Sequence, residues 1–174
     1  MNERLHFFGP RSGETTCIIC PGRNNMPHML DLRITGPHDD DGKALAEIRV
    51  EAMRSSLEAI GRFDPVRARE RFLASYDPAD TQVVFLDDQI VGFYVVRRRS
   101  DHLYLDHLYI RPPHQGKGLG RKIVRTVQEE AREAGLPIRL MALKQSSAND
   151  FYRSCGFAFV TSDAFDNHYV WNVQ

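Results

Sequence analysis

The sequence predicts a single α/β (α+β) domain built on a mixed central sheet of about six to seven strands with four helices. Two observations carry this prediction. From about residue 30, strand-like and helix-like patterns follow in the order strand, two helices, three strands, helix, strand, helix, two strands. The long helix after the third of those consecutive strands returns the chain to another apolar strand, and such a crossover joins parallel strands.

Length and composition narrow the class of protein. The chain has 174 residues, which suits one domain, and its 23 Lys plus Arg balance its 23 Asp plus Glu. Because basic residues do not outnumber acidic ones, we expect no nucleic-acid partner. Because the sequence has no apolar run of about 18 residues, we expect no membrane partner. The odd count of 3 cysteines fits a reducing compartment, so we predict a cytoplasmic protein.

Residues 1–28 show no sustained period and are predicted to be an irregular N-terminal extension, followed by the domain at 29–174. Cys17 and Cys20 have the spacing of half a zinc site, but no second pair follows them. We therefore interpret them as incidental thiols and expect no metal.

The first half of the domain supplies a strand, two helices and a meander. Alternation predicts a strand at 30–34, acidic residues 39–41 begin a helix that Gly61 ends, and Asp64-Pro65 begins a second helix to about Ser75. Strands at 81–86, 90–98 and 102–110, joined by polar turns, form an antiparallel meander.

The second half begins with the long helix, which Gly135 ends. A strand at 138–143 follows and is expected to lie parallel to the strand ending at Ile110. Ser146 or Ser147 is expected to cap a short helix that runs to Ser154. Strands at 157–161 and 168–173 close the chain.

A glycine-rich turn lies between the strand that ends at Ile110 and the long helix. Pro112 and Pro113 stop the strand, and Gly116, Gly118 and Gly120 leave main-chain N–H groups uncovered where a helix begins. Because the helix dipole adds positive charge there, this is a site for a diphosphate.

The spacing of this turn excludes two familiar phosphate loops. Lys117 is followed by Gly118 instead of a hydroxyl residue, which argues against a magnesium-nucleotide loop. Gly120 comes one residue early for the dinucleotide fingerprint. The remaining alternative to a ligand site is a glycine-rich connection that binds nothing.

Two motifs together carry a family resemblance. The stretch Gln115-Gly116-Lys117-Gly118-Leu119-Gly120, after Leu108-Tyr109-Ile110, resembles the acyl-CoA pyrophosphate loop of the GNAT superfamily of N-acetyltransferases. Downstream, Asn149, Tyr152 and Gly156-Phe157 resemble the helix that flanks the pantetheine arm in that superfamily. The resemblance runs from about residue 30 to the C-terminus and implies the GNAT fold, with the fourth and fifth strands parallel and splayed.

The resemblance implies acetyl-CoA as co-substrate and no metal. Asn149 would hydrogen-bond the pantetheine arm, and Tyr152 would point its hydroxyl toward the thioester sulfur; the alternative is a core aromatic pair with a surface Asn. The implied cofactor-binding residues are Leu108, Ile110, Gln115, Gly116, Lys117, Gly118, Leu119, Gly120, Arg121, Asn149 and Tyr152.

The implied chemistry is direct attack of an amine on the acetyl thioester in a ternary complex, with Tyr152 as proton donor. Many relatives carry a Glu at the position of Tyr104, so this chain departs from the pattern of the family at the base. Alternation predicts Asp106 on the same strand face as Tyr104 and His107 on the other face. We consider both as bases, and water-carried proton transfer as the alternative.

We expect an N-acetyltransferase of a small amine or a peptide, with a non-catalytic acyl-CoA-binding sensor as the alternative. The acceptor is expected to contact the two helices at 53–76. Candidate contacts are Phe63, Tyr76 and Tyr104 as lining and Glu51 or Glu58 as partners of a cationic amine. A twofold homodimer is also expected.

Overall fold

We describe the protein from a computed structural model, in which residues 32–38 and 41–173 are described. The expected extension at 1–28, with Cys17 and Cys20, lies outside the described residues, as do the first two residues of the expected first strand. Within the described ranges, no helix is long and apolar enough to cross a membrane.

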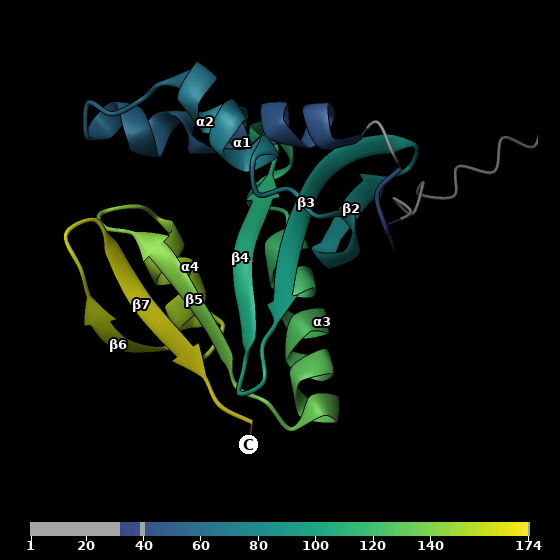
Figure 1. Ribbon diagram of the computed structural model, residues 1–174, viewed down its shortest axis with the longest axis vertical. Coiled ribbons are helices and arrows are strands. Elements are labelled where there is room, and N and C mark those ends of the chain that lie inside the picture. The colour runs from purple at the N-terminus through teal and green to yellow at the C-terminus, as the bar shows by residue number, and fades with distance from the viewer. Residues whose placement is uncertain (1–31, 39–40, 174) are drawn as a thin grey trace, which may run out of the picture.

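Across residues 32–38 and 41–173 the chain forms a seven-stranded mixed sheet, four α-helices and two short 3₁₀-helices (Figure 1). This confirms the α/β class expected from the sequence. The sheet order is β1-β2-β3-β4-β5-β7-β6, and all neighbours are antiparallel except β4 and β5. The elements are β1 (Leu32–Thr35), α1 (Asp41–Ala59), α2 (Pro65–Leu73), η1 (Pro78–Asp80), β2 (Thr81–Leu86), β3 (Gln89–Arg98), β4 (Leu103–Ile110), η2 (Pro112–His114), α3 (Leu119–Ala134), β5 (Ile138–Leu143), α4 (Ala148–Ser154), β6 (Ala158–Ser162) and β7 (Asp166–Trp171).

Most element ends follow local signals. The Asp64 side chain accepts a hydrogen bond from the Arg67 N–H at 3.0 Å, which caps α2 one residue before Pro65. At the other end of the domain, α3 stops at Gly135, which has a φ of 65° and returns its N–H to the last helical carbonyls.

One cap and one strand boundary show how the structure departs from the expectation. Ser147 occupies the cap position of α4 but makes no side-chain capping hydrogen bond. Strand β7 begins at Asp166, two residues before the expected position. The reason is a tight turn, because one oxygen of Asp163 accepts the N–H groups of both Phe165 and Asp166 at 2.8 Å.

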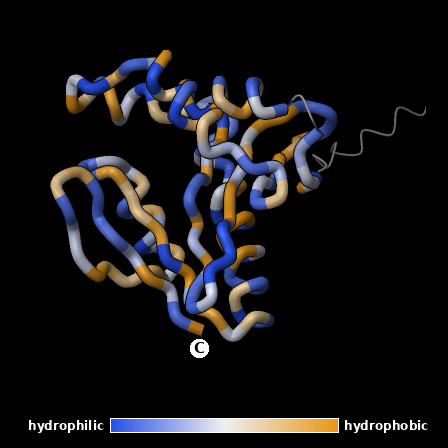
Figure 2. Tube along the Cα trace, in the orientation of Figure 1, coloured by the Kyte–Doolittle hydropathy of each residue, from blue (hydrophilic) through white to orange (hydrophobic). Residues whose placement is uncertain are grey.

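The two faces of the sheet carry separate cores. On one face α3 packs Ile123, Val127 and Ala131 against the central strands. On the other face α1 and α2 pack Leu45 and Phe72 among others against β2 and β3. Figure 2 shows hydrophobic segments along the strands and alternating hydropathy along the helices, as expected for helices that bury one face.

Strands β4 and β5 start together and then separate. They pair only from Leu103 with Ile138 to Leu105 with Leu140, although β4 continues to Ile110 and β5 to Leu143. Figure 1 shows the two strands diverging above their shared end. The expected parallel, splayed pair is confirmed, and past Leu105 the β4 edge that faces β5 has no strand partner there.

A β-bulge interrupts β4 beside this gap. Val95 of β3 pairs with His107 and Val96 pairs with Leu105, so Asp106 is the extra residue. The prediction that Asp106 and His107 lie on opposite faces is therefore wrong. A bulge cancels the alternation, and the Asp106 carboxylate lies 4.0 Å from His107 Nε2 on the side of α1 and α2.

Candidate active site

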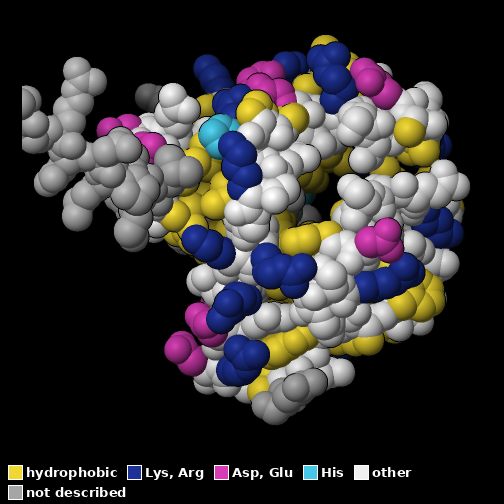
Figure 3. All heavy atoms as spheres, turned by 180° about the vertical axis from the view of Figure 1, so that it is seen from behind, with side chains coloured by type: hydrophobic (Ala, Val, Ile, Leu, Met, Phe, Trp, Pro, Cys, Tyr) yellow, Lys and Arg dark blue, Asp and Glu magenta, His cyan; other side chains and the backbone are white. Residues whose placement is uncertain are grey.

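A pocket of about 580 Å³ lies where β4 and β5 separate. Its lining comes from α1, the end of β4, the glycine-rich turn, the end of β5 and the start of α4. Figure 3 shows the hollow from the side that carries α3, with Lys and Arg side chains beside it. Of the residues expected at the site, the pocket is lined by Asp106, Leu108, Ile110, Gln115, Gly116, Gly118, Leu119, Gly120, Arg121 and Tyr152, but not by Lys117, His107 or Asn149.

The glycine-rich turn presents main-chain N–H groups. Gly116 and Gly118 have φ values of 73° and 82°, a backbone conformation that favours glycine. The first hydrogen bond of α3 runs from Lys122 to the Gly118 carbonyl, and the N–H groups of residues 116–121 have no acceptor within the described part of the chain. Such a row of free donors at a helix N-terminus fits the diphosphate of coenzyme A.

Gln115 has a different role from its neighbours. Its N–H donates to the Pro112 carbonyl at 3.2 Å, so it adds no free amide to the row. Its side-chain amide donates to the Ile110 carbonyl at 2.7 Å and thereby ties the turn to the end of β4.

The third glycine is required by packing. A Cβ on Gly120 would lie 3.2 Å from the ring of Phe151, so glycine lets α4 approach the start of α3. The Arg121 guanidinium reinforces this contact by donating to Ser154 O at 2.9 Å and to Ser154 Oγ at 3.0 Å. The turn and α4 are thus held together as two adjoining parts of the pocket.

Tyr152 points its aromatic ring into a buried part of the pocket. Only 8% of the residue is exposed, and its hydroxyl has no hydrogen-bond partner among the described residues. Burial raises the pKa of the Tyr152 hydroxyl well above its ordinary value, and the neighbouring Tyr109 and Cys155 add to the rise. The hydroxyl therefore stays protonated at neutral pH and is available as a proton donor.

Asn149 lies next to the pocket but its side chain is turned into the protein. The amide nitrogen donates to the carbonyls of Leu143 at 2.9 Å and Ser146 at 2.8 Å. The amide oxygen accepts from Asn167 at 2.8 Å and from the Tyr169 hydroxyl at 3.0 Å. These four bonds use the polar atoms that the resemblance assigned to the pantetheine arm.

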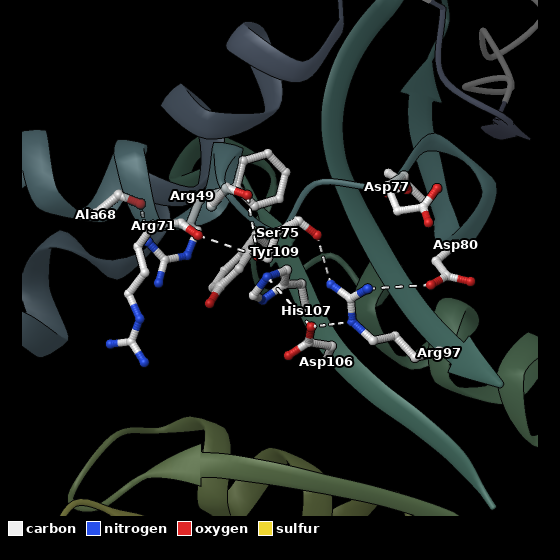
Figure 4. Close-up of polar contacts among 12 residues, drawn as sticks. Arg49, Ala68, Arg71, Ser75, Asp77, Asp80, Arg97, Asp106, His107 and Tyr109 are labelled. Carbon is white, nitrogen blue, oxygen red and sulfur yellow. Dashed lines mark hydrogen bonds and ion pairs between the residues drawn. The ribbon is translucent and has the colours of Figure 1, made fainter. Parts of the chain in front are cut away.

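Asp106 belongs to a partly buried ion-pair network (Figure 4). Arg97 donates through Nε to Asp106 at 2.8 Å and through the rest of its guanidinium to Asp80 at 3.3 Å and Ser75 O at 2.9 Å. Asp106 also lines the pocket, so its carboxylate faces the gap while Arg97 holds it.

His107 lies in an aromatic cage on the α2 side of β4. Its ring centroid is 5.6 Å from those of Phe72 and Tyr109, and its Nδ1 has no hydrogen-bond partner among the described residues. Burial lowers the pKa of His107 to about 4; Asp106 opposes this shift, and Arg49 and Arg97 add to it. The ring is therefore neutral at physiological pH.

Of the range 53–76 expected to contact the acceptor, Met53, Ser55 and Ser56 of α1 line the pocket. Met141 and Tyr109 line it as well, and the Tyr109 hydroxyl donates to Met53 Sδ at 3.2 Å. No local signal identified Met141 or Tyr109, because their contact with α1 joins segments far apart in the sequence.

The residues proposed for the acceptor from the sequence lie elsewhere. Phe63, Tyr76 and Tyr104 do not line the pocket. Glu51 accepts from Arg111 at 2.7 Å, and Glu58 pairs with Arg54 at 3.7 Å along α1. Within the described ranges, no group of three or more His, Cys, Asp and Glu side chains is arranged to hold a metal.

Comparisons with known proteins agree with this geometry. The family described as Acetyltransferase (GNAT) domain matches residues 51–173. The aminoglycoside N(6')-acetyltransferase type 1 of Stenotrophomonas maltophilia is 31% identical over 107 residues, covering 54% of this chain and 69% of that protein.

Two solved structures illustrate the shared fold. The PaiA N-acetyltransferase of Thermoplasma acidophilum in complex with coenzyme A superposes with a TM-score of 0.75 at 18% identity, over 83% of this chain and 100% of that chain. The ribosomal-protein-S18-alanine N-acetyltransferase of Escherichia coli gives a TM-score of 0.60 at 16% identity, over 80% and 91% of the two chains.

Proposed function

We propose that this chain, which belongs to the GNAT acetyltransferase family, transfers an acetyl group from acetyl-CoA to a primary amine of a small molecule or peptide. The observation that carries the proposal is a single pocket that joins the free N–H groups of residues 116–121 to the protonated Tyr152 across the gap between β4 and β5. Direct acyl transfer requires a site that binds the diphosphate of the co-substrate and a proton donor near its thioester. The unpaired N–H groups and Tyr152 would supply these two functions within one pocket.

The turn and the edge of β4 would hold the co-substrate. We assign its diphosphate to the N–H groups from Gly116 to Arg121, with the positive charge of Lys117 at the exposed rim. Main-chain groups at Leu108 and Ile110 lie along the part of β4 that β5 has left. Asn149 stabilises another part of the pocket lining by donating hydrogen bonds to the carbonyls of Leu143 and Ser146. Acetyl-CoA itself supplies the activated acetyl group as a thioester.

We assign the acid role to Tyr152. Its hydroxyl would donate a proton to the departing sulfur, and its raised pKa keeps that proton in place until the step in which it is needed. Cys155 is not assigned a role, because burial raises the pKa of its thiol and favours the protonated, weakly nucleophilic form.

We assign receipt of the amine proton to Asp106, directly or through water. Asp106 lines the pocket, whereas His107 does not and is held neutral in its aromatic cage. The hydrogen bond from Arg97 Nε, at 2.8 Å, orients the Asp106 carboxylate. His107 Nε2 lies 4.0 Å from the Asp106 carboxylate, beyond hydrogen-bond distance, and we assign it no part in proton transfer.

Thiol release from acetyl-CoA with a panel of primary amines tests the proposal. We expect saturable turnover by the wild-type chain, and Tyr152→Phe should lower turnover by about 10²-fold or more while the affinity for coenzyme A stays nearly unchanged by calorimetry. Tyr94→Phe is the matched control, because Tyr94 is a buried tyrosine of β3 outside the pocket.

Two outcomes would contradict these assignments. Saturable binding of coenzyme A without turnover of any amine would identify a non-catalytic acyl-CoA-binding sensor. Turnover that is unchanged in Tyr152→Phe would remove Tyr152 from the mechanism while leaving the acetyltransferase function in place.

A further inference from the structure

Asp166 is the first residue of β7 and is not itself among the residues that line the pocket. Along β7, Tyr169 and Trp171 are buried in the α3-side core and Asn167 reaches Asn149 of α4. Because side chains alternate along a strand, Asp166 points to the opposite face. Its cross-strand partner on β5 is Leu143, which lines the pocket.

Coulombic interactions link the Asp166 carboxylate to residues of β4 and α2. Burial raises the pKa of Tyr104 to about 12, and Asp106 and then Asp166 contribute further. Asp166 also raises the pKa of the partly buried Tyr109, and Arg71 of α2 lowers the pKa of Asp166. The strand pairing agrees with these effects, because Tyr104 pairs with Arg139 of β5, which lies on the same sheet face as Leu143 and its partner Asp166.

Asp166 differs from Asp106 and Asp163 because it has no fixed partner. Asp106 is held by Arg97, and Asp163 accepts from His168 at 2.9 Å and from two main-chain N–H groups. The side chain of Asp166 makes no ion pair or hydrogen bond to any described residue, although it is partly buried.

The surroundings of Asp166 contain charges of both signs. Burial raises the pKa of Asp166, and the repulsion of Asp163 adds to the rise. His168 of β7, Arg71 of α2 and Lys144 after β5 oppose it. An ionised carboxylate without a partner in such a place is disfavoured in the free protein, and a bound cation would relieve that cost.

We propose that Asp166 is a specificity-determining residue of the acceptor site, and that its carboxylate selects amines that are cationic at neutral pH. The inference rests on the proposed acetyltransferase function and names its substrate class. Primary alkylamines are protonated at neutral pH and would be attracted, whereas arylamines are neutral and would gain nothing from Asp166.

Arg71 supplies a prediction of opposite sign. It is exposed and extends from α2 into the space between α2 and the β5–β7 part of the sheet (Figure 4). Its positive charge partly offsets that of Asp166. Removing the charge of Arg71 should therefore strengthen the attraction for a cationic acceptor, while removing that of Asp166 weakens it.

The experiment compares the KM and kcat values of 1,4-diaminobutane and 4-methoxyaniline. We expect Asp166→Asn to raise the KM of the diamine by about tenfold and to change its kcat by less than about threefold, with no change for the arylamine. Arg71→Gln should lower the KM of the diamine, and Asp166→Glu should restore most of the wild-type value. Asp88→Asn removes the same charge from the fully exposed β2–β3 turn and should change neither constant.

The outcomes separate this inference from the function on which it rests. A wild-type enzyme that acetylates the diamine with a KM insensitive to Asp166→Asn would overturn the inference alone. So would a wild-type enzyme that acetylates only the arylamine. An absence of turnover with every amine would overturn the acetyltransferase function and this inference together.

Discussion

At the residue scale, the β4 bulge decides the chemistry of Asp106 and His107. It places two adjacent residues on one face, where Asp106 meets Arg97 and the pocket while His107 enters an aromatic cage. Neighbours in the chain thus receive different environments, one ionic and one apolar. The pKa of His107 falls to about 4 chiefly because the ring is buried.

The buried His107 predicts a loss of stability in acid. Its folded-state pKa of about 4 lies below the ordinary 6.5, so protons bind the unfolded chain first. The free energy of unfolding should be constant above about pH 6.5 on this account and should fall as the pH drops toward 4, by on the order of 3 kcal/mol at most. Denaturant unfolding at a series of pH values measures it.

The control for this prediction is another histidine. His107→Gln should flatten the decline between pH 6.5 and 4, whereas His38→Gln, at an exposed position, should keep the wild-type decline. A decline of equal size in both variants would mean that a different group titrates.

At the element scale, α4 is positioned by one buried amide. Asn149 joins the end of β5, the loop before α4 and strand β7 through hydrogen bonds of 2.8 to 3.0 Å. Leu143 and Ser146, whose carbonyls it holds, both line the pocket. The element that carries Tyr152 is thereby fixed relative to the strands on one side, and Arg121 fixes it to the glycine-rich turn on the other.

This arrangement predicts that Asn149→Ala acts first on stability. The change leaves two carbonyls and two donors without their partner, and we expect the free energy of unfolding to fall by about 2 to 4 kcal/mol without any cofactor present. Asn172→Ala, at an exposed position after β7, should change it by less than about 0.5 kcal/mol.

Calorimetry with coenzyme A completes the test of Asn149. We expect Asn149→Ala to bind coenzyme A more weakly as a secondary effect, because Leu143 and Ser146, which line the pocket, would shift. An Asn149→Ala variant with unchanged stability but weakened coenzyme A binding would instead assign Asn149 to direct contact with the pantetheine arm.

At the scale of the whole molecule, the sheet consists of two parts joined by the short β4–β5 pairing. The part β1–β4 carries α1 and α2, and the part β5–β7–β6 carries α4 with Tyr152. The site lies where the two parts separate, so every residue assigned to it depends on how they are held. A cation–π contact of Arg62 with Phe165, at 4.2 Å, connects α1–α2 to the β6–β7 turn across the gap.

The outer edge of the sheet bears on the expected homodimer. Strand β6 ends the sheet, its five residues are exposed, and Phe159 and Val160 are 51% and 58% exposed. Because an exposed apolar edge strand readily pairs with another chain, we expect two copies to associate there. Light scattering should give twice the mass of the chain, and Val160→Lys should give the mass of one. A wild-type mass of one chain at micromolar concentration would contradict the expectation.

The sequence by itself determined the features that short-range physics controls. The Asp64-Pro65 cap, the Gly135 stop, the turn conformations of Gly116 and Gly118, and the crossover that makes β4 and β5 parallel all follow from propensities and connection length. These signals lie within a few residues of the element that they specify, which is why they could be recognised in the sequence.

Only the tertiary structure decided the rest. The register of β3 against β4 created the bulge at Asp106, packing of α4 against β7 turned Asn149 inward, and the separation of β4 from β5 opened the pocket between Leu108 and Leu143. Each outcome depends on contacts between segments distant in the chain. Such contacts are selected by the fit of whole elements, and no local pattern of residues contains that information.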